Sequence, residues 1–285
     1  MLHARGWRVA NRFTQALLIA LALPAIAVPL ACLLYLLMRG LPGFDSNLFS
    51  LNLGESGFGS SQGIMAQVIG SLALSILSCL LALPLAIGLS LYSRLYAGPR
   101  SNSVMQHVLT TFQSIPPLVY GLCGLVVFVH LLGWGISLAA GAIVLAMIIL
   151  PVLTLNTIHA LERVPSDYTD AARALGMSPS RVVWHVWRPR AWRSLLTGLF
   201  LAVARTLSET APILFTATVF SGASWPNSLF APVTSLQTHI FYLAQEAVDE
   251  NAVARAWSSA LVLVTLVAMF SLIAHLLNRR RSHHG

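Results

Sequence analysis

The chain has 285 residues, of which 56% are hydrophobic and only 9% are charged, which is too little charge to cover the surface of a soluble globular protein. Apolar runs longer than about 18 residues recur along the chain, as in helices that cross a lipid core about 30 Å thick. The formal net charge of +8 comes from Arg alone, since there is no Lys, and these Arg cluster between apolar runs, which favours cytoplasmic membrane anchors over nucleic-acid binding.

The first apolar run, residues 13–38, follows three Arg in the N-terminal tail. Ala25-Ile26-Ala27 within this run resembles a signal-peptidase site, but the run is about twice as long as the apolar core of a signal peptide. We therefore expect the run to remain in the protein as its first transmembrane helix. The second run, residues 64–92, ends at Arg94.

Residues 101–161 carry no formal charge and are too many for a single crossing. Gly133-Trp134-Gly135 divides them into two spans, and Pro116-Pro117 breaks the helix ahead of the first of these. Two further runs complete a prediction of six transmembrane helices, so we expect an all-α, polytopic membrane protein with one transmembrane domain over residues 1–285. The last four spans lie near residues 116–132, 136–158, 194–220 and 256–277.

The distribution of Arg predicts the orientation of these spans, because positively charged loops stay on the cytoplasmic side. Fourteen Arg fall on one side, in the N-terminal tail, the 93–103 loop, the 159–193 loop and the C-terminus. Only Arg39 and Arg255 fall on the other side, together with five acidic residues. Both termini are therefore predicted to be cytoplasmic, which agrees with an even number of spans.

Motifs for covalent chemistry are missing, so we expect no catalytic residue, no cofactor and no metal site. A P-loop needs a Lys, which the chain lacks, so the chain does not bind ATP by that device. The three Cys lie in apolar runs, and the nine His lack the spacing of metal ligands. Residues 59–63 match the Gly-x-Ser-x-Gly pattern of hydrolases, but a flexible outside loop is expected there because no strand precedes them.

Two short helices are predicted inside the 159–193 loop. The first, residues 168–175, has an acidic residue just before it and ends at Gly176, which can adopt the left-handed conformation of a helix cap. The second begins at Ser178-Pro179 and is expected to stop where Pro189 follows Arg188.

Small side chains on the first of these helices, Ala171 and Ala172, give the loop a shape that suits insertion into a groove on a partner protein. The alternative is a helix pair on the membrane surface, held there by Arg and by Trp184, Trp187 and Trp192. The geometry expected from the sequence favours neither reading over the other.

The same loop resembles the signature of binding-protein-dependent ABC importer permeases, which reads Glu-Ala-Ala-x3-Gly-x9-Ile-x-Leu-Pro. The chain departs from this pattern with Asp for Glu, Val for Ile and Arg188 for Leu. In that family the loop docks onto the ATPase subunit, so the resemblance implies the same role for the matching positions. These positions are Asp170, Ala171, Ala172, Gly176, Val186 and Pro189.

A second segment, residues 204–217, reads Ala-Arg-Thr-Leu-Ser-Glu-Thr-Ala-Pro-Ile-Leu-Phe-Thr-Ala. It is similar to the fifth helix of the A-type permease of the bacterial phosphate-specific ABC transporter, with Ser208 in place of Gly. Further similarities are Arg39-Gly40 after the first helix, residues 119–122 in the third, and Ala256-Trp257 at the start of the sixth. The family usually has Ser where this chain has Pro117.

Arg205 is predicted to lie near the middle of the membrane, eleven residues from Ser194 and eleven from Thr216. An isolated charge there costs about 3 kcal/mol, so it should face a partner or a wet cavity. Glu209 lies one helical turn further on, on the same face. Either the two form an ion pair that only holds helices together, or Arg205 meets a hydrated dianion whose binding Glu209 moderates.

Pro212 is expected to loosen the helix just after this pair and to free backbone groups for the passage. Together with the resemblance, this predicts a substrate path formed by Arg205, Glu209, Thr210 and Pro212.

The resemblance thus implies a non-catalytic permease subunit of an ATP-driven inorganic phosphate importer in the bacterial inner membrane. The implied partners are a second permease, two cytoplasmic ATPase subunits, a periplasmic or extracellular phosphate-binding protein and the lipid bilayer, but no nucleic acid. Alternatives are a permease for another oxyanion (molybdate, tungstate or phosphonate) and an intramembrane hydrolase, although no nucleophile and base stand out. A structural or assembly protein would not need Arg205 and Glu209 inside the membrane.

Overall fold

A computed structural model describes residues 2–45, 48–49, 63–219, 227–246 and 250–279. Every regular element in these ranges is a helix and none is a strand, which confirms the all-α prediction. The Gly-x-Ser-x-Gly match at residues 59–63 lies, except for Gly63, outside the described residues. The elements are α1 (Leu2–Gly40), η1 (Leu41–Gly43), α2 (Met65–Leu95), α3 (Pro99–Ser114), α4 (Pro117–Gly124), η2 (Leu125–Leu131), α5 (Leu138–Glu162), α6 (Ser166–Ala174), α7 (Pro179–Val182), η3 (Val183–Trp187), α8 (Arg188–Thr206), α9 (Ala211–Thr216), α10 (Leu236–Glu246) and α11 (Glu250–Arg279).

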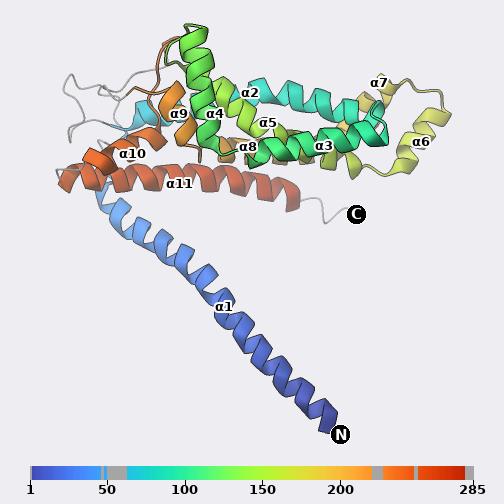
Figure 1. Ribbon diagram of the computed structural model, residues 1–285, viewed down its shortest axis with the longest axis horizontal. Coiled ribbons are helices and arrows are strands. Elements are labelled where there is room, and N and C mark those ends of the chain that lie inside the picture. Colours follow the sequence, from blue (N-terminus) through green and yellow to red (C-terminus); the bar gives the residue numbers. More distant parts are fainter. Residues whose placement is uncertain (1, 46–47, 50–62, 220–226, 247–249, 280–285) are drawn as a thin grey trace.

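The centre of the molecule is α5, which packs against α2, α3 and α8, while α11 packs against α8 (Figure 1). Ser137 starts α5, because its hydroxyl accepts a hydrogen bond from the backbone N–H of Ala140 at 3.3 Å. Gly133 and Gly135 precede this start with φ angles of 66° and 67°, conformations that suit glycine. They confirm the predicted division of the uncharged stretch into two parts.

The first helix projects away from the other described helices, and near its C-terminal end it contacts α11 (Figure 1). The two helices approach closely at Gly40, as shown by the fact that a Cβ atom there would lie only 2.9 Å from the Cβ of Leu261. Ser258 also donates a hydrogen bond to the carbonyl of Gly40 at 2.9 Å. This contact gives a structural reason for glycine in the Arg39-Gly40 pair.

Among the residues that the structure describes, four helices are long and apolar enough to cross a membrane: α1, α2, α5 and α11. They correspond to the predicted first, second, fourth and sixth spans. The structure does not reproduce the other two as unbroken helices, so the six-helix count is not confirmed as such, and a fifth crossing arises only if a bent helix pair is counted as one.

That bent pair corrects the predicted third span, residues 116–132. A helix precedes it, α3 (Pro99–Ser114), and the two parts meet at an angle of 87°. The bend occurs because Ile115 precedes a proline and is extended, with φ −69° and ψ 127°, and the two following prolines cannot donate to the preceding turn. Tyr120 fastens the bend by donating a hydrogen bond to the carbonyl of Phe112 at 2.9 Å.

The predicted fifth span, residues 194–220, is also broken. Its helix starts earlier, at Arg188, and stops at Thr206, and a second short helix, α9, begins at Ala211. Pro212 explains the interruption, since its ring would clash with the carbonyl of Ser208 and it has no N–H to donate.

Candidate functional site

The break between α8 and α9 holds the four residues of the predicted substrate path. Arg205 lies in the last turn of α8, Glu209 and Thr210 lie between the helices, and Pro212 is in the first turn of α9. Arg205 is about 16 Å along the helix from Ser194, which is about half the thickness of a lipid core. The structure therefore brings all four side chains to one short segment.

Arg205 and Glu209 form an ion pair, with 2.9 Å between Nη2 of Arg205 and Oε1 of Glu209. The side chain of Arg205 is 55% exposed on this chain, whereas that of Glu209 is only 11% exposed. The carboxylate is thus held inside the subunit, while the guanidinium remains open at its surface. Such an arrangement can present a positive charge to an anion or to a neighbouring subunit.

Two polar residues that the sequence did not single out stabilise the break. The side-chain amide of Gln237, on α10, donates a hydrogen bond of 2.7 Å to the carbonyl of Leu207, which the end of α8 leaves without a helical partner. The hydroxyl of Ser71, on α2, donates to the side-chain oxygen Oε1 of Gln237 and accepts from the backbone N–H of Leu236, each at 2.8 Å. Both side chains are buried, so this network replaces water at the break.

Ser71 is a serine within an apolar run, and nothing in the sequence predicts its part in this hydrogen-bond network. Ser71 and Gln237 are 166 residues apart in the sequence, and Gln237 and Leu207 are 30 residues apart. Their contacts depend on the break between α8 and α9.

Close packing against α4 fixes the start of α9. A Cβ atom at Gly121 would lie 2.8 Å from the Cα of Pro212, so only glycine allows this approach without a shift. Gly121 belongs to the segment 119–122 that carried part of the sequence resemblance.

The loop between α5 and α8 forms a small core of its own. Ala172, Val186 and Trp187 are buried there together with Val182. The indole N–H of Trp187 donates to the hydroxyl of Thr169 at 3.0 Å, which ties the start of α8 to α6. Gly176 has a φ of 73° and confirms the predicted left-handed turn after the first loop helix.

The second loop helix does not stop at Arg188, as the sequence led us to expect. Helical structure continues from Pro179 through a π-helical segment, Val183–Trp187, into α8. The wider π turn, in which the N–H of Arg188 bonds the carbonyl of Val183, lets the chain accommodate Pro189 without ending the helix. Arg188, where the family pattern has Leu, lies over the ring of Trp184, 4.7 Å from its centroid.

The predicted docking residues therefore divide into two groups. Asp170, Ala171, Gly176 and Pro189 are exposed, whereas Ala172 and Val186 are buried inside the loop and shape it from within. Ala172, one of the two small residues expected to enter a partner's groove, therefore lies inside the loop. The most exposed of the large apolar residues in the loop is Leu175, at 83%.

No group of three or more His, Cys, Asp or Glu side chains that could hold a metal ion occurs in the described parts of the chain. The free cysteines Cys32, Cys79 and Cys123 form no disulfide.

Comparisons with known proteins give one family and one fold. A family model described as "Binding-protein-dependent transport system inner membrane component" matches residues 82–283. The chain is 33% identical to the probable ABC transporter permease protein YqgI of Bacillus subtilis over 77% of this chain and 79% of that protein. It is 31% identical to the phosphate transport system permease protein PstA of Xylella fastidiosa, over 85% of this chain and 83% of that protein.

Solved structures share the fold at low sequence identity. A chain of a bacterial alginate ABC transporter matches with a TM-score of 0.68 and 15% identity, over 98% of this chain and 99% of that chain. A chain of the MetNI methionine ABC transporter matches with a TM-score of 0.58 and 18% identity, over 74% of this chain and 92% of that one.

Proposed function

This chain belongs to the family of binding-protein-dependent transport system inner membrane components, and from that premise we propose that its substrate is inorganic phosphate. As a member of the family it is a permease subunit of an ABC importer in the inner membrane. Such subunits are non-catalytic membrane components, which rules out the intramembrane hydrolase considered from the sequence.

Phosphate is the substrate that the names of the relatives favour. The PstA proteins of Xylella fastidiosa and Mycobacterium tuberculosis, the second 27% identical over 95% of this chain, are both phosphate transport system permeases. Molybdate, tungstate or phosphonate would require only local differences along the path.

The observation that carries the proposal is the ion pair at the break between α8 and α9. An exposed guanidinium about halfway along the membrane, backed by a carboxylate, is suited to attract a hydrated dianion without trapping it. Thr210 and Pro212 lie beside this pair, where the interrupted helix frees backbone groups. In this proposal these four residues line the path of the anion.

The loop around α6 is the proposed docking site for an ATPase subunit. Its exposed residues Asp170, Ala171 and Leu175 would enter a groove on the ATPase, while the buried Ala172 and Val186 hold the loop in shape. Gly176 supplies the turn and Pro189 lies at the start of α8. ATP-driven closure of the ATPase pair would move this loop and, through α8, the break.

The complete transporter proposed here contains this chain, a second permease, two ATPase subunits on the cytoplasmic side and a phosphate-binding protein outside. Both termini and the 159–193 loop would face the cytoplasm, because the Arg-rich segments lie on that side.

The test uses the purified transporter in liposomes, with the binding protein on one side and ATP on the other. We expect ATP-dependent uptake of radiolabelled phosphate that unlabelled phosphate suppresses at lower concentration than molybdate, tungstate or a phosphonate. Suppression by one of these other anions at a lower concentration than phosphate would assign the chain to that oxyanion instead.

A further inference from the structure

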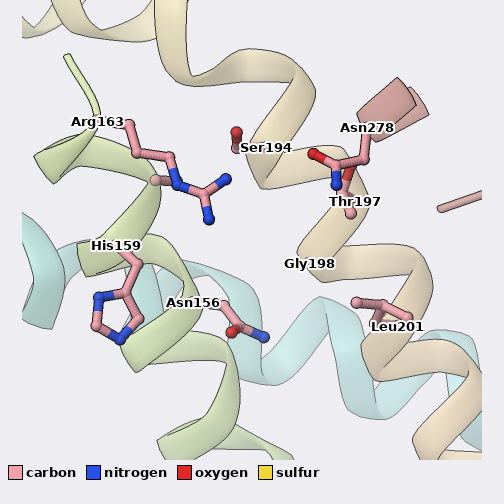
Figure 2. A pocket seen from close by; sticks show the side chains of 9 residues that line it. Asn156, His159, Arg163, Ser194, Thr197, Gly198, Leu201 and Asn278 are labelled. Atoms are coloured by element: carbon pink, nitrogen blue, oxygen red, sulfur yellow. The ribbon is translucent and has the colours of Figure 1, made fainter. Parts of the chain in front are cut away.

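A polar cavity of about 260 Å³ lies between the C-terminal end of α5, the first half of α8 and the C-terminal end of α11 (Figure 2). It lies away from the break between α8 and α9, and none of the four path residues lines it. The polar residues that line it are Asn156, His159, Arg163, Ser194, Thr197 and Asn278.

The guanidinium of Arg163 and the side-chain amides of Asn156 and Asn278 converge on one space, whereas the hydroxyl of Thr197 donates to the backbone carbonyl of Arg193 at 2.9 Å. Figure 2 shows the guanidinium of Arg163 extending toward α8, with the amides of Asn156 and Asn278 directed into the same gap. The ring of His159 points away from that gap (Figure 2) and lies 3.2 Å from a carboxylate oxygen of Glu162. Glu162, which precedes Arg163 in the sequence, is therefore in contact with His159.

The charge inside the cavity is positive. No acidic residue lines it, and Arg163 forms no ion pair with any residue that the structure describes. The C-terminal ends of α5 and α11 each contribute about half a negative charge. Arg163, which lines the cavity at the end of α5, carries one full positive charge, which outweighs the half charge of that helix end.

The number and kind of these groups select the ligand. One guanidinium and two side-chain amides can surround several oxygens of a small anion, and Arg pairs with phosphate oxygens through two parallel hydrogen bonds. A volume of about 260 Å³ is below the range of pockets for drug-sized molecules, so it suits a small group.

We propose that this cavity binds a phosphate group, either free inorganic phosphate or the headgroup of a phospholipid. The assignment of the cavity to the cytoplasmic side rests on the proposed function, because the cavity lies where α5 leads into the proposed ATPase-docking loop. Free phosphate at this site would come from the compartment into which the transporter releases it, so occupancy would follow the internal phosphate level.

Free phosphate is tested with the assembled transporter in an uncharged maltoside detergent, without ATP and without the binding protein. The chain carries Arg205→Gln and Glu209→Gln, so that the proposed path contributes nothing to binding. Equilibrium dialysis with radiolabelled phosphate should show at least tenfold weaker binding when Arg163→Gln or Asn156→Leu is added. Arg193→Gln is the matched control, since Arg193 is exposed on the same segment of α8 but does not line the cavity.

The lipid headgroup is tested on the same variants by native mass spectrometry with phosphatidic acid, and with diacylglycerol of the same chains as the control lipid. Selective loss of phosphatidic acid from Arg163→Gln, without a difference in phosphate binding, would assign the site to a lipid. If Arg163→Gln and Arg193→Gln retain both ligands equally, the cavity is no phosphate site and the proposal is wrong. This result does not depend on whether the transporter imports phosphate, because no uptake is measured.

Discussion

At the scale of single residues, the position of Arg205 and Glu209 determines what their ion pair can do. A pair that only joined two helices would be expected to bury both charges against each other. Here the carboxylate is 11% exposed and the guanidinium 55% exposed, so the positive end remains accessible on this subunit. The i, i+4 spacing predicted the pair from the sequence, because that contact is local.

Removal of both charges separates the two readings of this pair. If Arg205 serves the anion, the double variant Arg205→Gln, Glu209→Gln should insert, assemble and yet fail to import phosphate, with uptake reduced by at least tenfold. No unpaired buried charge remains in this variant, so insertion should be preserved. Uptake is measured in cells and normalised to the amount of membrane-inserted protein.

The single change Arg205→Lys sharpens this test. Lys keeps the charge but loses the planar fork that binds two phosphate oxygens together, so reduced uptake is expected in spite of the intact charge. Near-normal uptake in the double variant would end the assignment of Arg205 to the substrate path.

Gln237 leads to a second prediction at this scale. Gln237→Leu removes the donor to the carbonyl of Leu207 and the acceptor for Ser71, which leaves buried polar groups unsatisfied. Each such group costs about 1–3 kcal/mol, so the variant should unfold at a clearly lower temperature. Thermal unfolding of the detergent-solubilised complex measures this.

Ser208→Ala is the matched control for Gln237→Leu. Ser208 lies in the same break but is exposed, and its hydroxyl bonds only the carbonyl of Ala204. Its loss should change the unfolding temperature little, and equal effects of both variants would contradict the role given to Gln237.

At the scale of helices, apolar length predicts where the chain crosses the membrane, but not whether each crossing is one helix. Pro84 and Pro151 lie inside the unbroken helices α2 and α5, whereas Pro116 and Pro212 mark breaks. The difference lies in what replaces the lost hydrogen bond, and that depends on neighbours distant in sequence. Pro189 is a third case, because the π-helical turn before it absorbs the ring.

The loop around α6 gives the prediction at this scale. Leu175→Glu changes an exposed side chain, so the permease should keep its unfolding temperature, whereas the new charge should prevent docking into an apolar groove. We expect at least a tenfold loss of ATPase in co-purification with the permease.

Ala172→Asp serves as the comparison for this loop. It places an unpaired carboxylate in the buried cluster around Trp187, so it should lower the unfolding temperature as well as the ATPase yield. Wild-type ATPase yield with Leu175→Glu would favour the alternative in which the loop lies on the membrane surface.

At the scale of the whole molecule, the arrangement of the helices joins two segments that are distant in sequence. Asn278, near the end of α11, lines the same cavity as Arg163 at the end of α5 and Ser194 in α8. The last turn of α11 therefore lies beside the end of α5, where the loop that carries α6 begins, and that loop extends beyond the end of α11 (Figure 1). The Arg count assigned these two segments to one side without any knowledge of their contact.

Because α5 and α11 end beside each other, the topology prediction can be tested at two positions that must lie on the same side of the membrane. Both the C-terminus and the 159–193 loop should be cytoplasmic, because fourteen of the Arg fall in the segments on this side of the predicted spans, and Arg-rich loops stay in the cytoplasm. Reporter enzymes that are active only outside the cytoplasm should be silent when fused at Gly285 or after Arg163, and active when fused after Asn227. The fusions after Arg163 and at Gly285 must agree with each other whatever the orientation, since α5 and α11 end together. Disagreement between them would contradict the packing of α11 against α8. Activity of both fusions, with silence after Asn227, would show that the membrane orientation is the reverse of the predicted one. The reversed orientation would place the loop around α6 outside the cytoplasm, where no ATPase subunit could reach it, and would contradict its proposed role in ATPase docking.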